Sequence, residues 1–177
     1  MDLNSDGFVI LSIVFIGLYF ISLFFGNVSE RKQLKQSAVK DYINKVIYRI
    51  NEMNGSQFED FVEFVFRDIG YNVKQSPKTR DGGKDLILTT KKGKVYVEIK
   101  RYSSRNLVSS SLVLKLIGSA VSDGVYECIF LTTSGYTKDA INTAENSKVK
   151  IKLIDIDGFI DILKCCNHNN IMRYLGY

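Results

Sequence analysis

The amino-acid sequence predicts an α/β domain in which helices flank a mixed β-sheet, preceded by one apolar helix and a linker helix. Helical patterns alternate with short β-rich runs in the order α-β-β-β-α-β-α-β-α, which is typical of a sheet with helices on its faces. A near-continuous apolar run over residues 126–131 is typical of a central strand buried on both faces. About 150 residues follow the apolar helix, enough for one domain with its own core.

The spacing of apolar and capping residues places each element of the domain, which is expected over residues 54–166. Ser56 is expected to cap the first helix, and Gly70 to end it. Alternation, helical spacing and turn residues set the later boundaries. The later elements are a strand over 71–75, a hairpin over 81–102, a helix over 108–121, a strand over 126–131, a helix over 136–146, a strand over 149–154, a helix over 157–166 and a C-terminal tail over 167–177.

An uninterrupted apolar segment lies near the N-terminus, from Phe8 to Phe25. Its 18 residues include no charge, Pro, Asn or Gln, and as a helix they would span about 27 Å, close to the hydrocarbon thickness of a bilayer. The acidic start of the chain and the lack of a small-residue cleavage site argue against a signal peptide. We therefore expect residues 8–25 to form a transmembrane helix in the lipid bilayer, after a short extracytoplasmic N-terminus over residues 1–7.

Positive charge follows this segment and does not precede it. All 24 Lys and Arg residues, and 17 of the 19 Asp and Glu residues, lie after residue 25. The positive-inside rule therefore predicts a single-pass protein of the cell membrane with its N-terminus outside and its domain in the cytoplasm. The basic excess suits a polyanionic partner, although an anionic membrane surface would attract the juxtamembrane lysines equally well. Residues 26–53 are expected to form a basic juxtamembrane linker helix whose apolar stripe packs on the domain or pairs with another chain, as in a homodimer.

Two carboxylates and a lysine fall on one face of the predicted hairpin. Asp85 precedes Glu98 by 13 residues, and Lys100 follows Glu98 after one more residue. With a turn at Lys92-Gly93 or over residues 91–94, Asp85 lies opposite Lys100 and Ile87 lies opposite Glu98. Either turn places the three charged side chains on one face, whereas a slip of one residue would move Asp85 to the other face.

The chemistry of this trio follows from its charges. Two ionised carboxylates at close range repel each other unless a cation lies between them. Mg²⁺ prefers oxygen ligands and commonly takes one or two carboxylates, and the backbone carbonyl of Ile99 is a candidate further ligand, with Mn²⁺ as a substitute metal. Such a metal activates water and polarises phosphoryl oxygens, while Lys100 can orient or deprotonate that water or offset the charge that develops on the phosphate. The trio therefore predicts phosphodiester hydrolysis.

These residues resemble the active-site motif of the PD-(D/E)xK nuclease superfamily, with Asp85 followed by Glu98-Ile99-Lys100. Over about residues 53–164 the wider pattern resembles the Mrr-type restriction endonuclease domain. The resemblance implies a restriction-endonuclease-like fold, Asp85 and Glu98 as metal ligands, Lys100 as the catalytic lysine, and Glu59 as an accessory acid. Lys84 replaces the nominal proline of the motif. The matching segments are 55–59, 70–73, 81–85, 97–102 and 131–134, with Ala140 beyond them.

Glu59 and the residues around the hairpin have more than one interpretation. Because Ser56 and Glu59 have the spacing of a capping box, Glu59 is either the acid of that box, the accessory acid, or both. Basic and hydroxyl side chains near the hairpin are expected to contact the DNA backbone. They are Arg80, Lys84, Arg101, Tyr102, Arg105 and Thr133.

The sequence as a whole predicts a membrane-anchored, Mg²⁺-dependent endodeoxyribonuclease that acts on DNA at the cytoplasmic face. The resemblance implies a type IV, Mrr-like enzyme that restricts foreign DNA. One alternative with the same chemistry is a repair or junction-type nuclease. An alternative of another class is a non-catalytic membrane tether that binds nucleic acid, although the intact Asp85, Glu98 and Lys100 argue against a retired site.

Overall fold

A computed structural model describes residues 30–76 and 83–177 of the chain. The chain divides into two compact units, Met1–Asn44 and Lys45–Tyr177, each of which is considered by itself. The predicted transmembrane helix over residues 8–25 lies outside the described residues, and so does the stretch 1–7. Within the described ranges, no helix combines the length and the apolar character needed to cross a bilayer.

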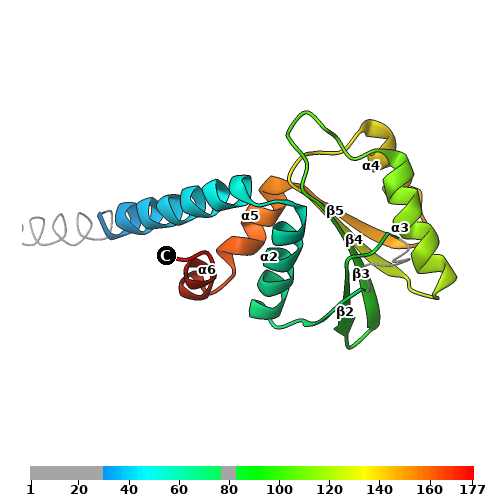
Figure 1. Ribbon diagram of the computed structural model, residues 1–177, viewed down its shortest axis with the longest axis horizontal. Coiled ribbons are helices and arrows are strands. Elements are labelled where there is room, and N and C mark those ends of the chain that lie inside the picture. The colour runs from blue at the N-terminus through cyan, green and yellow to red at the C-terminus, as the bar shows by residue number, and fades with distance from the viewer. Residues whose placement is uncertain (1–29, 77–82) are drawn as a thin grey trace, which may run out of the picture. The chain divides into compact units, whose positions relative to one another are not determined.

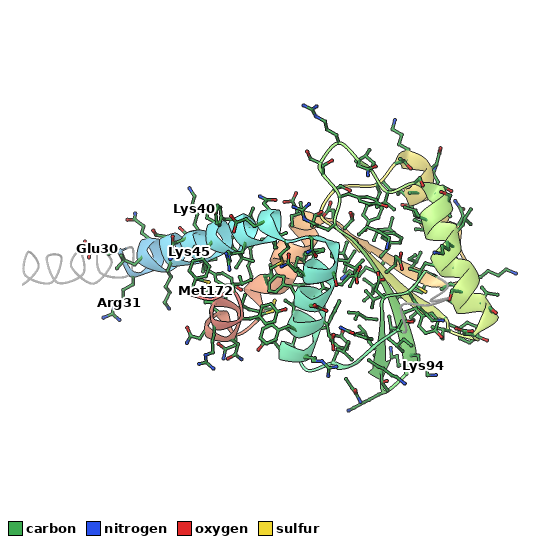
Figure 2. All side chains as sticks on the ribbon, in the orientation of Figure 1. Glu30, Arg31, Lys40, Lys45, Lys94 and Met172 are labelled. Atoms are coloured by element: carbon green, nitrogen blue, oxygen red, sulfur yellow. The ribbon has the colours of Figure 1, made fainter. Side chains whose placement is uncertain are left out.

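A helix over residues 30–52 occupies most of the expected linker. In the first unit it presents exposed side chains, among them Glu30, Arg31 and Lys40 (Figure 2). In the second unit the same helix contributes to the core, because Val46 and Ile50 are buried. The C-terminal part of the predicted apolar stripe therefore packs on the domain.

Five strands form one mixed sheet in the order β1-β2-β3-β4-β5 (Figure 1). The pairs β1–β2 and β2–β3 are antiparallel, and the pairs β3–β4 and β4–β5 are parallel. This arrangement confirms the predicted mixed α/β sheet. The strands are β1 (Asn72–Gln75), β2 (Leu86–Thr90), β3 (Gly93–Lys100), β4 (Glu127–Thr132) and β5 (Lys150–Ile154).

Helices cover both faces of this sheet, with α3 and α4 on one side and α2 and α5 on the other (Figure 1). The C-terminal residues, expected to be a tail, contain a further helix, α6. The side chain of Asn167 accepts hydrogen bonds from the amides of Asn169 and Asn170 at its start, and Ile171 is fully buried, which explains why this short segment is helical. The helices are α2 (Gly55–Asp68), α3 (Ser110–Ser122), α4 (Lys138–Glu145), α5 (Ile156–Lys164) and α6 (His168–Tyr174).

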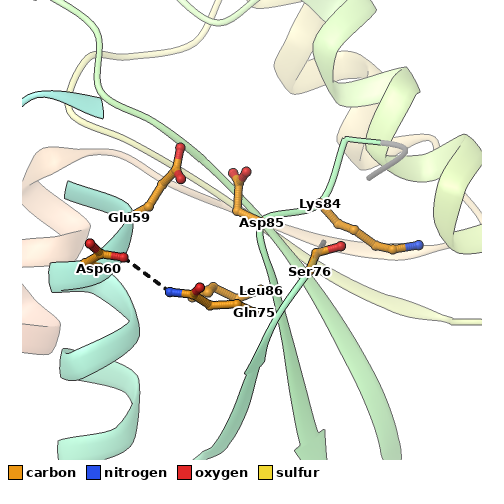
Figure 3. Close-up of a pocket in the computed structure, with 7 residues that line it drawn as sticks. All are labelled: Glu59, Asp60, Gln75, Ser76, Lys84, Asp85 and Leu86. Carbon is orange, nitrogen blue, oxygen red and sulfur yellow. Dashed lines mark hydrogen bonds between the residues drawn. The ribbon is translucent and has the colours of Figure 1, made fainter. Parts of the chain in front are cut away.

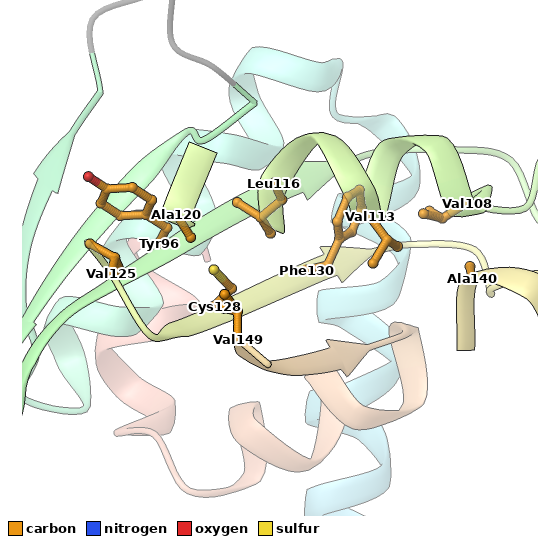
Figure 4. Close-up of a cluster of buried hydrophobic side chains, with 10 residues drawn as sticks. All are labelled: Tyr96, Val108, Val113, Leu116, Ala120, Val125, Cys128, Phe130, Ala140 and Val149. Carbon is orange, nitrogen blue, oxygen red and sulfur yellow. The ribbon is translucent and has the colours of Figure 1, made fainter. Parts of the chain in front are cut away.

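Apolar side chains fill the space on both sides of the sheet. Under α3 and α4 the core includes Leu116 and Phe130, both fully buried (Figure 4). On the other side Phe58 of α2 meets Phe159 of α5 edge to face, with ring centroids 5.8 Å apart. Truncating one of these phenylalanines to alanine is expected to cost about 3–5 kcal/mol of stability. The sheet is thus a rigid support for the ends of β2 and β3.

The β2–β3 hairpin turns one residue earlier than the sequence suggested. Thr90 pairs with Gly93, so the two-residue turn is Lys91-Lys92. The amide of Lys92 donates to Thr90 Oγ1 (3.1 Å), and Gly93 begins β3 at φ +130, a backbone angle that favours glycine. Consequently Ile87 pairs with Tyr96 rather than Glu98, which corrects the predicted register. The difference is two residues, so each side chain keeps its predicted face.

Candidate active site

Asp85, Glu98 and Lys100 come together where β2 begins and β3 ends. The corrected register, continued by one residue beyond the Leu86–Val97 pair, places Asp85 opposite Glu98. The Lys100 ammonium lies 2.5 Å from Glu98 Oε1 and 3.8 Å from Asp85 Oδ2. It also donates to the backbone carbonyl of Ile99 (3.0 Å). All three oxygens predicted as metal ligands therefore surround one positive charge.

Backbone hydrogen bonds hold Asp85 against β3. Its amide donates to the carbonyl of Val97 (2.7 Å), and its carbonyl accepts from the amide of Ser76 (2.8 Å). Its side chain in turn accepts from the amide of Ile99, with 2.7 Å between N and Oδ2. The position of the Asp85 carboxylate is therefore fixed by the strand that carries Glu98 and Lys100.

The Glu98 side chain is buried more deeply than an ordinary carboxylate. Only 6% of it is exposed, and its Oε2 is buried without a hydrogen-bond partner among the described residues. Burial, followed by the negative charge of Asp85, raises the pKa of Glu98 to about 7, although Lys100 and Lys115 oppose the rise. A carboxylate in this state is stabilised by any additional cation that reaches Oε2.

Lys100 is protonated in this environment. Its own burial lowers its pKa, but the neighbouring carboxylates of Glu98, Asp85 and Glu59 together raise the pKa above its ordinary value. The ammonium is therefore a permanent positive charge at neutral pH. It faces two carboxylates, Asp85 and Glu98, at the end of the hairpin.

The residues present fit a divalent cation with few protein ligands. The described part of the chain contains no group of three or more His, Cys, Asp or Glu side chains arranged to hold a metal. The donor set is instead two carboxylates, from Asp85 and Glu98, and the carbonyl of Ile99. Mg²⁺ typically binds one or two carboxylates and keeps several waters, so this set suits Mg²⁺ or Mn²⁺ better than a metal that needs a full protein cage. The observation that supports this fit is Glu98 Oε2, which is buried and has no hydrogen-bond partner in the described part of the chain.

Glu59 is not the acid of the capping box. The cap of α2 is Asn54, whose side chain accepts from the amide of Gln57 while the Gln57 side chain accepts from the amide of Asn54, both at 2.9 Å. The prediction that Ser56 caps this helix was therefore wrong, and Glu59 lies two residues beyond Gln57. Its side chain lines a hollow with Asp85, and the two carboxylates point to the same side of the hollow (Figure 3).

Three of the predicted DNA contacts already have partners within the protein. Thr133 Oγ1 accepts from the amide of Tyr102 (2.8 Å) and donates to its carbonyl (2.7 Å), so the pair prolongs the pairing of β3 and β4. The Arg101 guanidinium donates to the carbonyl of Asn51. These contacts tie the end of β3 to the rest of the domain.

The other predicted DNA contacts differ among themselves. The Lys84 ammonium points away from Asp85 (Figure 3) and pairs with Asp123 Oδ2 at 2.6 Å. Arg105 is exposed in the loop after β3. Arg80 lies outside the described residues.

The sequence analysis missed Lys115, which lies on α3. A Cβ at Gly83 would be 3.0 Å from Cγ and Cδ of the Lys115 side chain, so this lysine lies directly over the chain that leads to Asp85. Its positive charge also lowers the pKa of Glu98. No sequence signal singles out Lys115, because its proximity depends on how α3 packs on the sheet.

The fold and the trio define a restriction-endonuclease-like α/β domain, and comparison with known proteins agrees. The family model Mrr_cat, restriction endonuclease, matches residues 50–163, which is more than half of the chain. The protein therefore belongs to this restriction endonuclease family.

Two curated proteins share this region. An uncharacterized protein of Sinorhizobium fredii, y4cE, is 36% identical over 111 residues, which cover 60% of this chain and 28% of that protein. The type IV methyl-directed restriction enzyme EcoKMrr of Escherichia coli is 26% identical over 128 residues, which cover 68% of this chain and 41% of the enzyme. The chain thus spans less than half the length of these relatives.

Two solved structures share the fold. The DNA modification-dependent restriction endonuclease AspBHI has a TM-score of 0.57 and 18% identity, over 77% of this chain and 38% of that one. The MspJI restriction endonuclease in complex with a 27-mer oligonucleotide has a TM-score of 0.56 and 18% identity, over 78% of this chain and 35% of that one. At this level of identity the comparison establishes the fold.

Proposed function

We propose that this protein is a metal-dependent DNA endonuclease that cleaves phosphodiester bonds by hydrolysis. The observation that supports this most directly is the convergence of oxygens from Asp85, Glu98 and Ile99 on one positive charge, while Glu98 Oε2 has no hydrogen-bond partner among the described residues. A purely structural ion pair needs only one carboxylate for one lysine. The surplus carboxylate fits a site built to bind a further cation.

Each side chain of the trio has a distinct role in this proposal. Asp85 and Glu98, with the carbonyl of Ile99, hold a Mg²⁺ or Mn²⁺ ion, which when bound supplies Lewis acidity and an activated water. Lys100 places a positive charge and hydrogen-bond donors where negative charge develops on the phosphate. Glu59 lies beside the same hollow and acts as an accessory acid.

The names of two relatives support a proposal for the substrate class. EcoKMrr is methyl-directed and AspBHI is DNA modification-dependent. We therefore propose foreign, modified DNA as the substrate, and restriction as the biological role. Arg105 is exposed in the loop that follows β3 and is the proposed contact with the DNA backbone on this side of the site.

The test is a plasmid cleavage assay with the full-length protein in detergent. Methylated and unmethylated plasmids are incubated with Mg²⁺, with Mn²⁺, or with EDTA, alongside a Glu98→Gln control. We expect nicked or linear DNA with either metal and none with EDTA or with the variant. Intact plasmids under every metal condition would overturn the proposed activity. Equal cleavage of both plasmids would overturn the proposed dependence on methylation.

We also propose that residues 8–25 anchor the protein in the cell membrane with the domain in the cytoplasm. The support is the length of the apolar segment and the positive charge that follows it. After an alkaline carbonate wash, the full-length chain should stay with the membrane pellet and a chain starting at Ser29 should be released. Protease added to intact cells should spare the domain. Digestion from outside would contradict the orientation.

A further inference from the structure

Lys84 belongs to a compact cluster where the hairpin meets the end of α3. Its ammonium donates to Asp123 Oδ2 (2.6 Å) and to Ser119 Oγ (3.2 Å), both near the end of α3. It also lies 4.2 Å from the centre of the Tyr96 ring. The Tyr96 hydroxyl donates to the same Asp123 oxygen (2.7 Å). Lys84, Tyr96 and Asp123 are called the Lys84 clamp below.

The Lys84 clamp joins the two chain segments that carry the carboxylates of the trio. Lys84 immediately precedes Asp85, and Tyr96 lies two residues before Glu98 on the same face of β3. Asp123, at the end of α3, binds both. A shift of Lys84 would move the backbone of Asp85, whose side chain accepts from the amide of Ile99.

The charges of the clamp are satisfied without DNA. The hydrogen bonds from Lys84 and Tyr96 hold the pKa of Asp123 below its usual range, so this carboxylate stays ionised at neutral pH. Only 15% of the Lys84 side chain is exposed. A lysine that binds phosphate would instead present a free ammonium to solvent.

We propose that Lys84 is a positioning residue, and that the Lys84 clamp sets the place of the Asp85 carboxylate relative to Glu98. This inference replaces the expected DNA contact at Lys84 and rests on the proposed nuclease function of the trio. In this role, the residue that precedes Asp85 holds the aspartate in place through an ion pair with Asp123, which is distant in the sequence.

A DNA contact and a positioning role for Lys84 predict different results for the substitutions Asp123→Asn and Lys84→Met. Asp123→Asn removes the charge that binds Lys84 and leaves the Lys84 ammonium in place. If Lys84 contacts DNA, this variant binds DNA as well as or better than wild type, and Lys84→Met raises KM. If Lys84 positions Asp85, both variants lower kcat, by roughly ten- to a hundredfold for a small misplacement, and leave KM within about twofold. Lys84→Arg should restore most of the rate, because it keeps the charge and the donors.

The decisive experiment combines kinetics with amide hydrogen exchange, measured residue by residue by NMR on the full-length protein in detergent. The Ile99 amide reports the place of Asp85, because it donates to the Asp85 carboxylate. We expect its exchange to be at least about tenfold faster in Lys84→Met and Asp123→Asn. Lys164→Met is the matched control, since it breaks the exposed pair between Lys164 and Asp161 and should change neither quantity.

The readouts separate this inference from the proposed function. Unchanged Ile99 exchange in both clamp variants, or a raised KM with unchanged kcat in Lys84→Met, would overturn the positioning role. A wild-type protein that cuts no DNA would overturn the proposed function, while faster Ile99 exchange in the two clamp variants would still support the clamp.

Discussion

Two neighbouring lysine–carboxylate clusters in this domain differ in how completely their charges are satisfied. In the Lys84 clamp, one lysine meets one carboxylate, Asp123, whose pKa is lowered by its hydrogen bonds. In the trio, one lysine meets two carboxylates, and burial raises the pKa of Glu98 to about 7. The clamp needs nothing further, whereas the trio holds a buried oxygen without a partner among the described residues.

This difference teaches how a structural ion pair is distinguished from a binding site in one sheet. Both clusters use β3 and the residues just before β2, and both involve a lysine whose pKa is raised. The two clusters differ in the number of carboxylates that pair with the lysine, which is one in the Lys84 clamp and two in the trio. A balanced pair stabilises the local backbone, and an unbalanced one is costly unless a ligand completes it.

The largest effect is expected from neutralising either carboxylate of the trio. Asp85→Asn or Glu98→Gln should reduce plasmid cleavage on the order of a thousandfold, because the metal ion that would stabilise the reacting phosphate is no longer held. The fold should remain, since each substitution preserves side-chain size. Cleavage rates are measured beside Lys164→Met as a control. If either variant cut plasmid at the wild-type rate, the trio would be a structural ion pair like the Lys84 clamp and not a binding site.

Lys100→Met should lose cleavage nearly as completely but for another reason. The variant lacks the positive charge beside the phosphate, by our proposal, and keeps both carboxylates. We expect a loss of roughly a hundredfold or more, with Mn²⁺ binding retained or strengthened in a calorimetric titration. Lost Mn²⁺ binding in a folded variant would show that Lys100 supports the site only structurally.

Glu59→Gln tests whether the site extends to α2. Because Asn54 and Gln57 form the capping box, Glu59 has no part in that cap, and the thermal midpoint should stay close to wild type. The cleavage rate should fall by about ten- to a hundredfold if its charge assists the reaction. A variant with normal rate and normal midpoint would remove Glu59 from the site.

The smallest expected effect is a pH dependence of stability in EDTA. The folded-state pKa of Glu98 is raised to about 7 from an ordinary value of 4.5. Folding therefore favours the protonated group, and this contribution to stability is present at low pH and is lost as pH rises from about 4.5 through about 7. Glu98→Gln should remove this decline and be the more stable protein at pH 8. The free energy of unfolding is measured by urea titration at several pH values. If the free energy of unfolding of the variant declined equally with pH, the decline would come from a group other than Glu98.

The sequence predicted that Asp85, Glu98 and Lys100 come together, but it did not predict the contacts that hold them. The trio shares a face despite the two-residue error in register, because side chains alternate with a period of two. The cap of α2 was misplaced because Asn54 with Gln57 and Ser56 with Glu59 both have capping-box spacing, and spacing alone does not choose between them.

The contacts of Lys84 show what local pattern cannot supply. Lys84 and Asp123 are 39 residues apart, and their pairing depends on how α3 packs against the sheet. A basic residue beside a predicted active site was therefore interpreted as a DNA contact. Lys115 was overlooked for the same reason.

The most direct test of the central claim is a calorimetric titration of the full-length protein with Mn²⁺, without DNA. The account predicts that wild type and Lys164→Met bind the metal, because the exposed pair between Lys164 and Asp161 is no part of the trio, and that Glu98→Gln does not. Mn²⁺ binding by Glu98→Gln with wild-type affinity, or no binding by the wild type, would contradict the claim that the unbalanced trio is a metal site.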